Sequence, residues 1–147
     1  MKVWLSVSIL LLLSNTAVGD ITFQHQRIRL GDHVVEVEVA DNDAKREHGL
    51  KERTSLGEDE GMLFVFPDSG SQVFWMHQTF TPLSLGIFDS HRKLIAIEKL
   101  APARSVMQIQ FPRFTTPKQT RYALEVPQGW FEEHQIPLGT TFEFMTD

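Results

Sequence analysis

Trp75, His77 and Thr79 stand together at the end of an apolar run and could form part of a binding site. Residue-by-residue alternation along a strand would place Trp75 and His77 on one face, opposite their apolar neighbours. An aromatic ring beside a titratable ring at a strand end is typical of small-ligand clefts. Trp75 could instead pack against a helix that carries Trp130, and the sequence leaves both interpretations open.

Two carboxylates, Glu125 and Asp89, could give His77 an acid–base partner or complete a metal site. Neither lies at a ligand spacing from His77, and the chain has no HExxH motif. No Gly-x-Ser-x-Gly motif occurs, and Ser69 and Ser71 are most simply turn residues. We expect no metal and no cofactor, and the predicted ligand-binding residues are Trp75, His77, Thr79 and Glu125.

Two functional hypotheses follow from these residues. The first is a non-catalytic domain that binds a small ligand or serves as an accessory protein, with a cleft near Trp75 and His77. The alternative is a small hydrolase that uses His77 with Glu125 or Asp89. The chain has no Cys, and it lacks a nucleophile motif and metal-ligand spacing, so the binding hypothesis is favoured.

The acidic run of residues 58–60 could bind a cation or be a solvated loop. A structural role is favoured here. Arg46 or Arg53 is expected to pair with a carboxylate of this run, above all Glu60, because a guanidinium is well shaped to bridge a carboxylate.

The hydrophobic pattern predicts the strands that must position these residues. Residues 21–30 and 35–39 alternate on either side of Gly31-Asp32, which predicts a β-hairpin. Residues 62–66 are apolar on both faces, as in a strand that is covered on both sides. Further strands are predicted over residues 72–78, 83–88, 93–100, 121–126 and 140–145, the last with Phe142 and Phe144 inward.

Two short helices complete the predicted fold. Asp41 or Asn42 can cap the first, and Gly49 can end it. Pro127 suits the first position of the second, which runs to about residue 135. Residues 101–117 fit either a short edge strand around Val106, Ile109 and Phe111 or a long covering loop. These elements predict a mainly β (α+β) domain, an antiparallel sheet of about seven to eight strands rolled into a barrel or sandwich, with the two helices capping it.

Residues 1–19 have the pattern of a secretory signal. Lys2 supplies a positive end, residues 3–13 are apolar but short for a membrane span, and Ala17-Val18-Gly19 suits cleavage before Asp20. An uncleaved N-terminal helix is the alternative. We expect a single domain over residues 20–147, periplasmic or secreted, with no stable membrane anchor after cleavage.

Composition limits the partners. The chain has a net charge of −5, and loss of Lys2 with the signal would make the domain more negative. We expect no nucleic-acid partner, because nucleic-acid affinity comes largely from Lys and Arg on phosphates. The expected partner is a small molecule or a protein of the cell envelope.

Several blocks of sequence form a recognisable series. They are residues 36–41, 46–50 with Arg53, 60–67, 74–76 with Thr79, and 122–125 before Gly129. In order and spacing they resemble the DUF192 family of uncharacterised proteins, over about residues 28–145. The resemblance implies a small, mostly β, often exported protein and no established activity. The residues of this pattern expected to have structural roles are Arg46, Gly49, Arg53, Glu60, Gly61 and Met62.

The chain departs from the usual family residues at several positions. The family commonly has Met where Lys51 stands, Lys-Asn where His77 and Gln78 stand, and Asp where Ser84 stands. A Cys pair that is common near residues 101–114 is missing here. These departures put any chemistry shared by the family in doubt for this chain.

Overall fold

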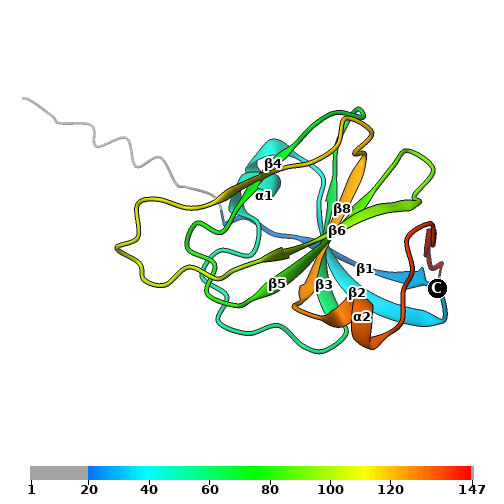
Figure 1. Ribbon diagram of the computed structural model, residues 1–147, viewed down its shortest axis with the longest axis horizontal. Coiled ribbons are helices and arrows are strands. Elements are labelled where there is room, and N and C mark those ends of the chain that lie inside the picture. The colour runs from blue at the N-terminus through cyan, green and yellow to red at the C-terminus, as the bar shows by residue number, and fades with distance from the viewer. Residues whose placement is uncertain (1–19, 147) are drawn as a thin grey trace, which may run out of the picture.

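The computed structural model describes residues 20–146, and the predicted signal segment lies outside this range. A seven-stranded sheet curls into a half-barrel, and a separate two-stranded ribbon lies beside it (Figure 1). Within residues 20–146 no helix is both long enough and apolar enough to span a membrane.

The sheet order is β6-β5-β8-β3-β2-β1-β9, while β4 and β7 form the ribbon. The strands are β1 Gln24–Leu30, β2 His33–Ala40, β3 Glu60–Val65, β4 Val73–Trp75, β5 Leu83–Phe88, β6 Leu94–Leu100, β7 Arg113–Thr115, β8 Tyr122–Pro127 and β9 Phe142–Phe144. The helices are α1 Asp43–His48 and α2 Trp130–Glu133. The prediction of a mainly β domain with two short helices is confirmed.

One pair of strands is parallel in an otherwise antiparallel sheet. β1 and β2 form the predicted hairpin across Gly31, but β2 and β3 run parallel. Parallel neighbours need a long crossover, which residues 41–59 provide with α1. The Asn42 side chain caps α1 by accepting from the Lys45 N–H at 2.9 Å, and Gly49 ends it with a φ of 53°. A positive φ of this kind favours glycine.

The sheet carries a hydrophobic core on each face. On one face, Trp130 and Phe131 of α2 join the buried side chains of β1, β2 and β8. On the other, Met62 and Phe64 pack with side chains from β4, β5 and the segment after α1. Leu63 belongs to the first core, so β3 serves both. The prediction that residues 62–66 are covered on both sides is confirmed.

The structure corrects the predicted strand over residues 72–78. β4 covers only Val73–Trp75, because its partner β7 is equally short. Of the two alternatives for residues 101–117, the loop is correct for residues 101–112, which include Val106, Ile109 and Phe111. The short strand β7 lies further on, at Arg113–Thr115.

Two predictions near the C-terminal end are wrong in detail. Pro127 does not begin a helix: it ends β8 opposite Leu83, and α2 begins after Gly129, whose φ of 91° reverses the chain. Phe142 is buried as expected, whereas Phe144 is 38% exposed because it belongs to the last, edge strand of the sheet.

Candidate functional site

A cavity of about 230 Å³ opens between the end of α1, the ribbon strand β4 and the face of the sheet that carries β3 and β8. The structure brings all four predicted ligand-binding residues to its lining: Trp75, His77, Thr79 and Glu125. Leu50, Phe64, Phe66 and Phe74 supply apolar wall. Two of these rings, Phe64 and Phe74, meet edge to face at 5.2 Å, which fixes the wall.

Glu125 is the most unusual group in the cavity. It lies on β8 between β3 and β5, directly opposite Met62 and Leu85, both fully buried. The side chain is only 5% exposed, and among residues 20–146 it has no hydrogen-bond or ion-pair partner. Within this range, every side-chain polar atom that is fully enclosed has a hydrogen-bond partner. The Glu125 carboxyl oxygens have none, so they are not fully enclosed, and we infer that they face the open space of the cavity.

Burial raises the pKa of Glu125 from its ordinary 4.5 to about 8. The cause is the loss of water around the ionised form, with no nearby cation to offset it. At pH 7 the group is therefore mostly a neutral carboxylic acid, which can both donate and accept a hydrogen bond.

Trp75 and His77 form one side of the cavity mouth. Their ring centroids are 5.7 Å apart, and the His77 ring also meets Phe111 edge-on at 5.3 Å. The Arg113 guanidinium lies over the Trp75 ring at 5.2 Å. Trp75 is 45% exposed, while Trp130 is buried in the core of the other face. The alternative in which Trp75 packs on the helix carrying Trp130 is therefore wrong.

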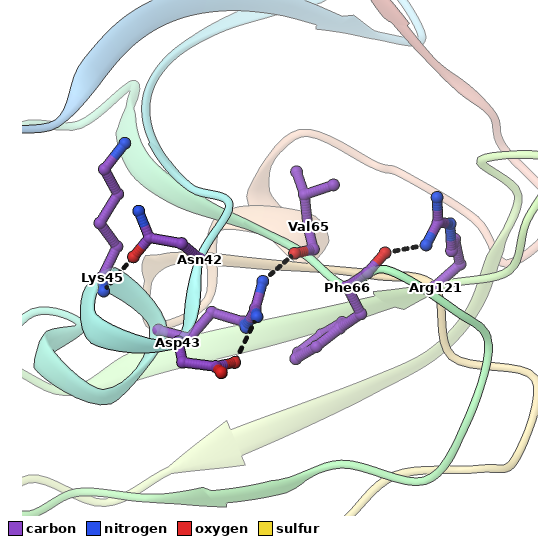
Figure 2. Close-up of polar contacts among 7 residues, drawn as sticks. Asn42, Asp43, Lys45, Val65, Phe66 and Arg121 are labelled. Atoms are coloured by element: carbon purple, nitrogen blue, oxygen red, sulfur yellow. Dashed lines mark hydrogen bonds and ion pairs between the residues drawn. The ribbon is translucent and has the colours of Figure 1, made fainter.

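Arg46 fixes α1, whose C-terminal end forms the opposite rim. Its guanidinium donates to the Val65 carbonyl at 2.6 Å and to Asp43 at 2.6 Å, and it lies over the Phe66 ring. Figure 2 shows the start of α1 beside the end of β3, where Arg121 donates to the Phe66 carbonyl from the other side. The helix is thus tied to the strand that supplies the apolar wall.

The predicted pairing of Arg46 or Arg53 with the acidic run is wrong. Arg53 donates to both carboxyl oxygens of Glu38, at 2.6 and 2.7 Å, because the crossover from β2 to β3 returns over β2. The Glu60 carboxyl instead accepts the Gly57 N–H at 2.9 Å and closes its own turn.

Gly61 allows β8 to approach β3 closely. A Cβ at this position would lie 2.4 Å from the Glu125 carbonyl oxygen, a distance that the backbone of β8 could relieve only by moving. A side chain at position 61 would therefore displace the strand that carries Glu125.

Not every candidate residue reaches the cavity. Asp89 lies in the β5–β6 turn, where its carboxyl accepts the N–H groups of His91 and Lys93 at 2.8 and 3.0 Å. Within residues 20–146 no group of three or more His, Asp or Glu side chains is placed to hold a metal. The structure thus brings His77 and Glu125 to one cavity and leaves Asp89 outside it.

Sequence reasoning missed some of the cavity's features. Leu50 and Phe66 line it, but nothing in their local pattern separates them from ordinary core residues. One signal in the sequence points to the unpartnered state of Glu125: it is the single charged residue in the otherwise apolar strand Tyr122–Pro127. A lone acid within such a strand indicates either a buried partner or a site.

The fold and the site define a small, mainly β domain whose curled half-barrel sheet carries an apolar cavity with a buried acid in its lining. The DUF192 family model, described as "Uncharacterized ACR", matches residues 26–144. The chain belongs to this family. No curated protein matches it.

Solved structures show the same fold. A protein from Sinorhizobium meliloti 1021, described as a "putative transcription regulator", is 24% identical with a TM-score of 0.74, over 86% of this chain and 98% of that one. A protein of unknown function from Novosphingobium aromaticivorans DSM 12444 is 26% identical with a TM-score of 0.73, over 82% and 86%. These likenesses concern the architecture.

Proposed function

We propose that this protein is a non-catalytic binding protein that holds a small ligand in the cavity lined by Trp75, His77, Thr79 and Glu125. The observation that carries the proposal is the Glu125 carboxyl, which is nearly enclosed, lacks a partner within residues 20–146 and lines that cavity. A buried polar group without a partner costs free energy, and a ligand that supplies the partner recovers it.

The cavity indicates the chemistry of the ligand. At about 230 Å³ it is smaller than the roughly 300–1,000 Å³ of drug-sized sites, so it suits a molecule the size of an amino acid or smaller. Phe64 and Phe74 favour an apolar body. Glu125 favours a head group that exchanges hydrogen bonds with it, such as a neutral amide or hydroxyl, or an ammonium group that pairs with its ionised form.

The two kinds of donor differ in their pH dependence. A neutral donor binds the protonated Glu125 that predominates below pH 8. An ammonium group favours the ionised carboxylate, so its binding releases a proton and strengthens as the pH rises toward 8.

A hydrolase that uses His77 with Glu125 remains the second candidate, because both line the same cavity. Two features weigh against it. Within residues 20–146 no hydrogen bond joins the two side chains, and the lining contains no Ser. The one hydroxyl among the predicted residues, Thr79, donates to the His77 backbone carbonyl at 3.3 Å. Catalytic nucleophiles instead lie within hydrogen-bond reach of a base.

A matched series of small molecules tests the binding proposal. In a background with Trp4→Phe and Trp130→Phe, Trp75 is the sole tryptophan of the chain, so its fluorescence reports on the cavity mouth. Butylamine and butyramide should change this fluorescence with dissociation constants of about 1–10 mM, given their few atoms. Butyrate has the same body, but its negative charge would have to be desolvated beside the Glu125 carboxyl and it offers that carboxyl no N–H, so it should bind at least about tenfold more weakly.

The Glu125→Leu variant provides the control, since it keeps the apolar wall and removes the partner for the head group. It should lose the preference for amine and amide over butyrate. If Trp75 fluorescence responds to none of the three, or responds to all of them equally, the binding proposal fails.

We further propose that the protein acts outside the cytoplasm, on a ligand or partner of the cell envelope. Residues 1–19 support this through their charged start, apolar run and small residues before Asp20. Mass spectrometry of the protein recovered from the periplasm or medium should find a chain that starts at Asp20. A chain with intact Met1 in the cytosolic fraction would contradict the proposal.

A further inference from the structure

We propose that the loop between β6 and β7, residues 101–112, docks the protein on an anionic lipid surface. We define its apolar tip as Val106, Met107 and Ile109, which are 71%, 81% and 91% exposed. Among residues 20–146 these are the most exposed large apolar side chains. Figure 1 shows the loop, in yellow, projecting from the body of the domain. Single exposed apolar residues are ordinary, whereas a cluster on a projection marks a contact surface.

Side chains of the loop form hydrogen bonds with the backbone N–H and C=O groups around the tip. The Gln108 side chain accepts the Arg104 N–H at 2.8 Å and donates to the Gln110 carbonyl at 2.7 Å. The Ser105 hydroxyl accepts the Met107 N–H at 3.1 Å. Backbone groups that are already paired cost less to move toward hydrocarbon. The tip is therefore an ordered turn that directs its apolar side chains outward.

The base of the loop is fastened to the domain. Ala103 donates its N–H to the Thr79 carbonyl at 2.8 Å, and the Phe111 ring packs against His77. Beyond it, β7 pairs with β4. The projection is thus held in place, so the apolar tip is available without a costly rearrangement.

The charges around the tip complement an anionic surface. Although the whole chain is acidic, residues 101–112 contain no Asp or Glu, and the charged residues nearest the tip in sequence are both cations. Arg104 and Arg113 bracket the tip. Arg113 lies over the ring of Trp75, which is 45% exposed, and tryptophan is enriched at membrane–water interfaces. Cations near an anionic leaflet add attraction that an apolar tip alone lacks.

The size of the tip favours lipid over a protein partner. A stable protein interface buries about 800 Å² on each partner with matched shape, which three aliphatic side chains on a narrow loop do not offer. Lipid needs no matched shape, and small apolar insertions with nearby cations bind it reversibly.

Vesicle co-sedimentation tests this proposal, which does not depend on ligand binding. The probes are phosphatidylcholine vesicles with and without about one-third phosphatidylglycerol. The wild type should bind the anionic vesicles, and 0.5 M salt should weaken that binding because it screens the cations. Val106→Ser, Met107→Ser and Ile109→Ser together should weaken it at least about tenfold. Leu138→Ser is the matched control, since Leu138 is also exposed, at 61%, outside the loop.

Residues 1–19 are the same in the wild type, the triple Ser variant and the control. Any vesicle binding by these residues is therefore the same throughout and does not account for a difference between them. In a background with Trp4→Phe and Trp130→Phe, where Trp75 is the sole tryptophan, brominated lipid should quench the Trp75 fluorescence. The proposal is overturned if the wild type ignores anionic vesicles, if the triple Ser variant binds as the wild type does, or if the control loses as much. It is also overturned if sedimentation velocity shows that the tip instead pairs two copies of the chain.

Discussion

Above pH 8, the Glu125→Gln variant should be more stable than the wild type by on the order of 5 kcal/mol, and at pH 4 the two should unfold alike. The reason is the burial of Glu125, which raises its pKa to about 8 in the folded protein against 4.5 in the unfolded chain. Below pH 4.5 both states of the wild type hold the proton, so ionisation adds no further penalty and the wild type resembles the Gln variant.

Between pH 4.5 and 8 the unfolded wild type releases the proton while the folded protein keeps it, so stability falls as the pH rises. Above pH 8 both states are ionised and the loss levels off. Gln keeps the shape and cannot ionise, so this dependence should disappear. Urea unfolding at pH 4, 6, 7 and 9 measures it. Glu58→Gln is the control, because Glu58 is exposed on the surface. If the free energy of unfolding depended on pH in the same way for Glu125→Gln and for the wild type, the carboxyl would be solvated in the folded protein.

Phe64→Asp should prevent folding. Phe64 is 4% exposed on β3, packs edge to face against Phe74, and lies in a strand paired on both sides. Losing the ring costs about 3–5 kcal/mol, and an unpaired buried carboxylate costs several more. Their sum approaches or exceeds the roughly 5–15 kcal/mol by which a domain is stable.

Val73→Asp is the matched control, because Val73 is also an apolar strand residue but is 58% exposed on the ribbon. It should remain soluble and melt cooperatively by circular dichroism. A soluble Phe64→Asp variant with a cooperative melt would mean that β3 is not central to the fold.

Much of the fold was predictable because its signals are local. The apolar run of β3 and the alternation in β2 each indicate a strand, and Asn42 with Gly49 brackets α1. The alternation in β4 also predicted correctly that Trp75 faces away from Phe74, which is buried.

What the sequence did not determine is which strands become neighbours. The partner of Arg53 is Glu38 rather than Glu60 because the crossover from β2 returns over β2, and no local pattern records this path. The isolation of Glu125 depends likewise on β3 and β5 flanking β8, since Met62 and Leu85 face it from strands distant in sequence. Candidate residues were predictable one by one, whereas their environment was not.

The position of β8 between β3 and β5 also constrains the order of assembly during synthesis. Until Pro127 has left the ribosome, the part of the sheet built from β1 to β3 and the β5–β6 hairpin have no strand to join them. Both present open edges, which are prone to pairing with other chains. Insertion of β8 then brings an ionised Glu125 out of water, so at neutral pH the step that unites the sheet must also take up a proton. Between about pH 4.5 and pH 8, the step that unites the two parts of the sheet therefore becomes less favourable as the pH rises.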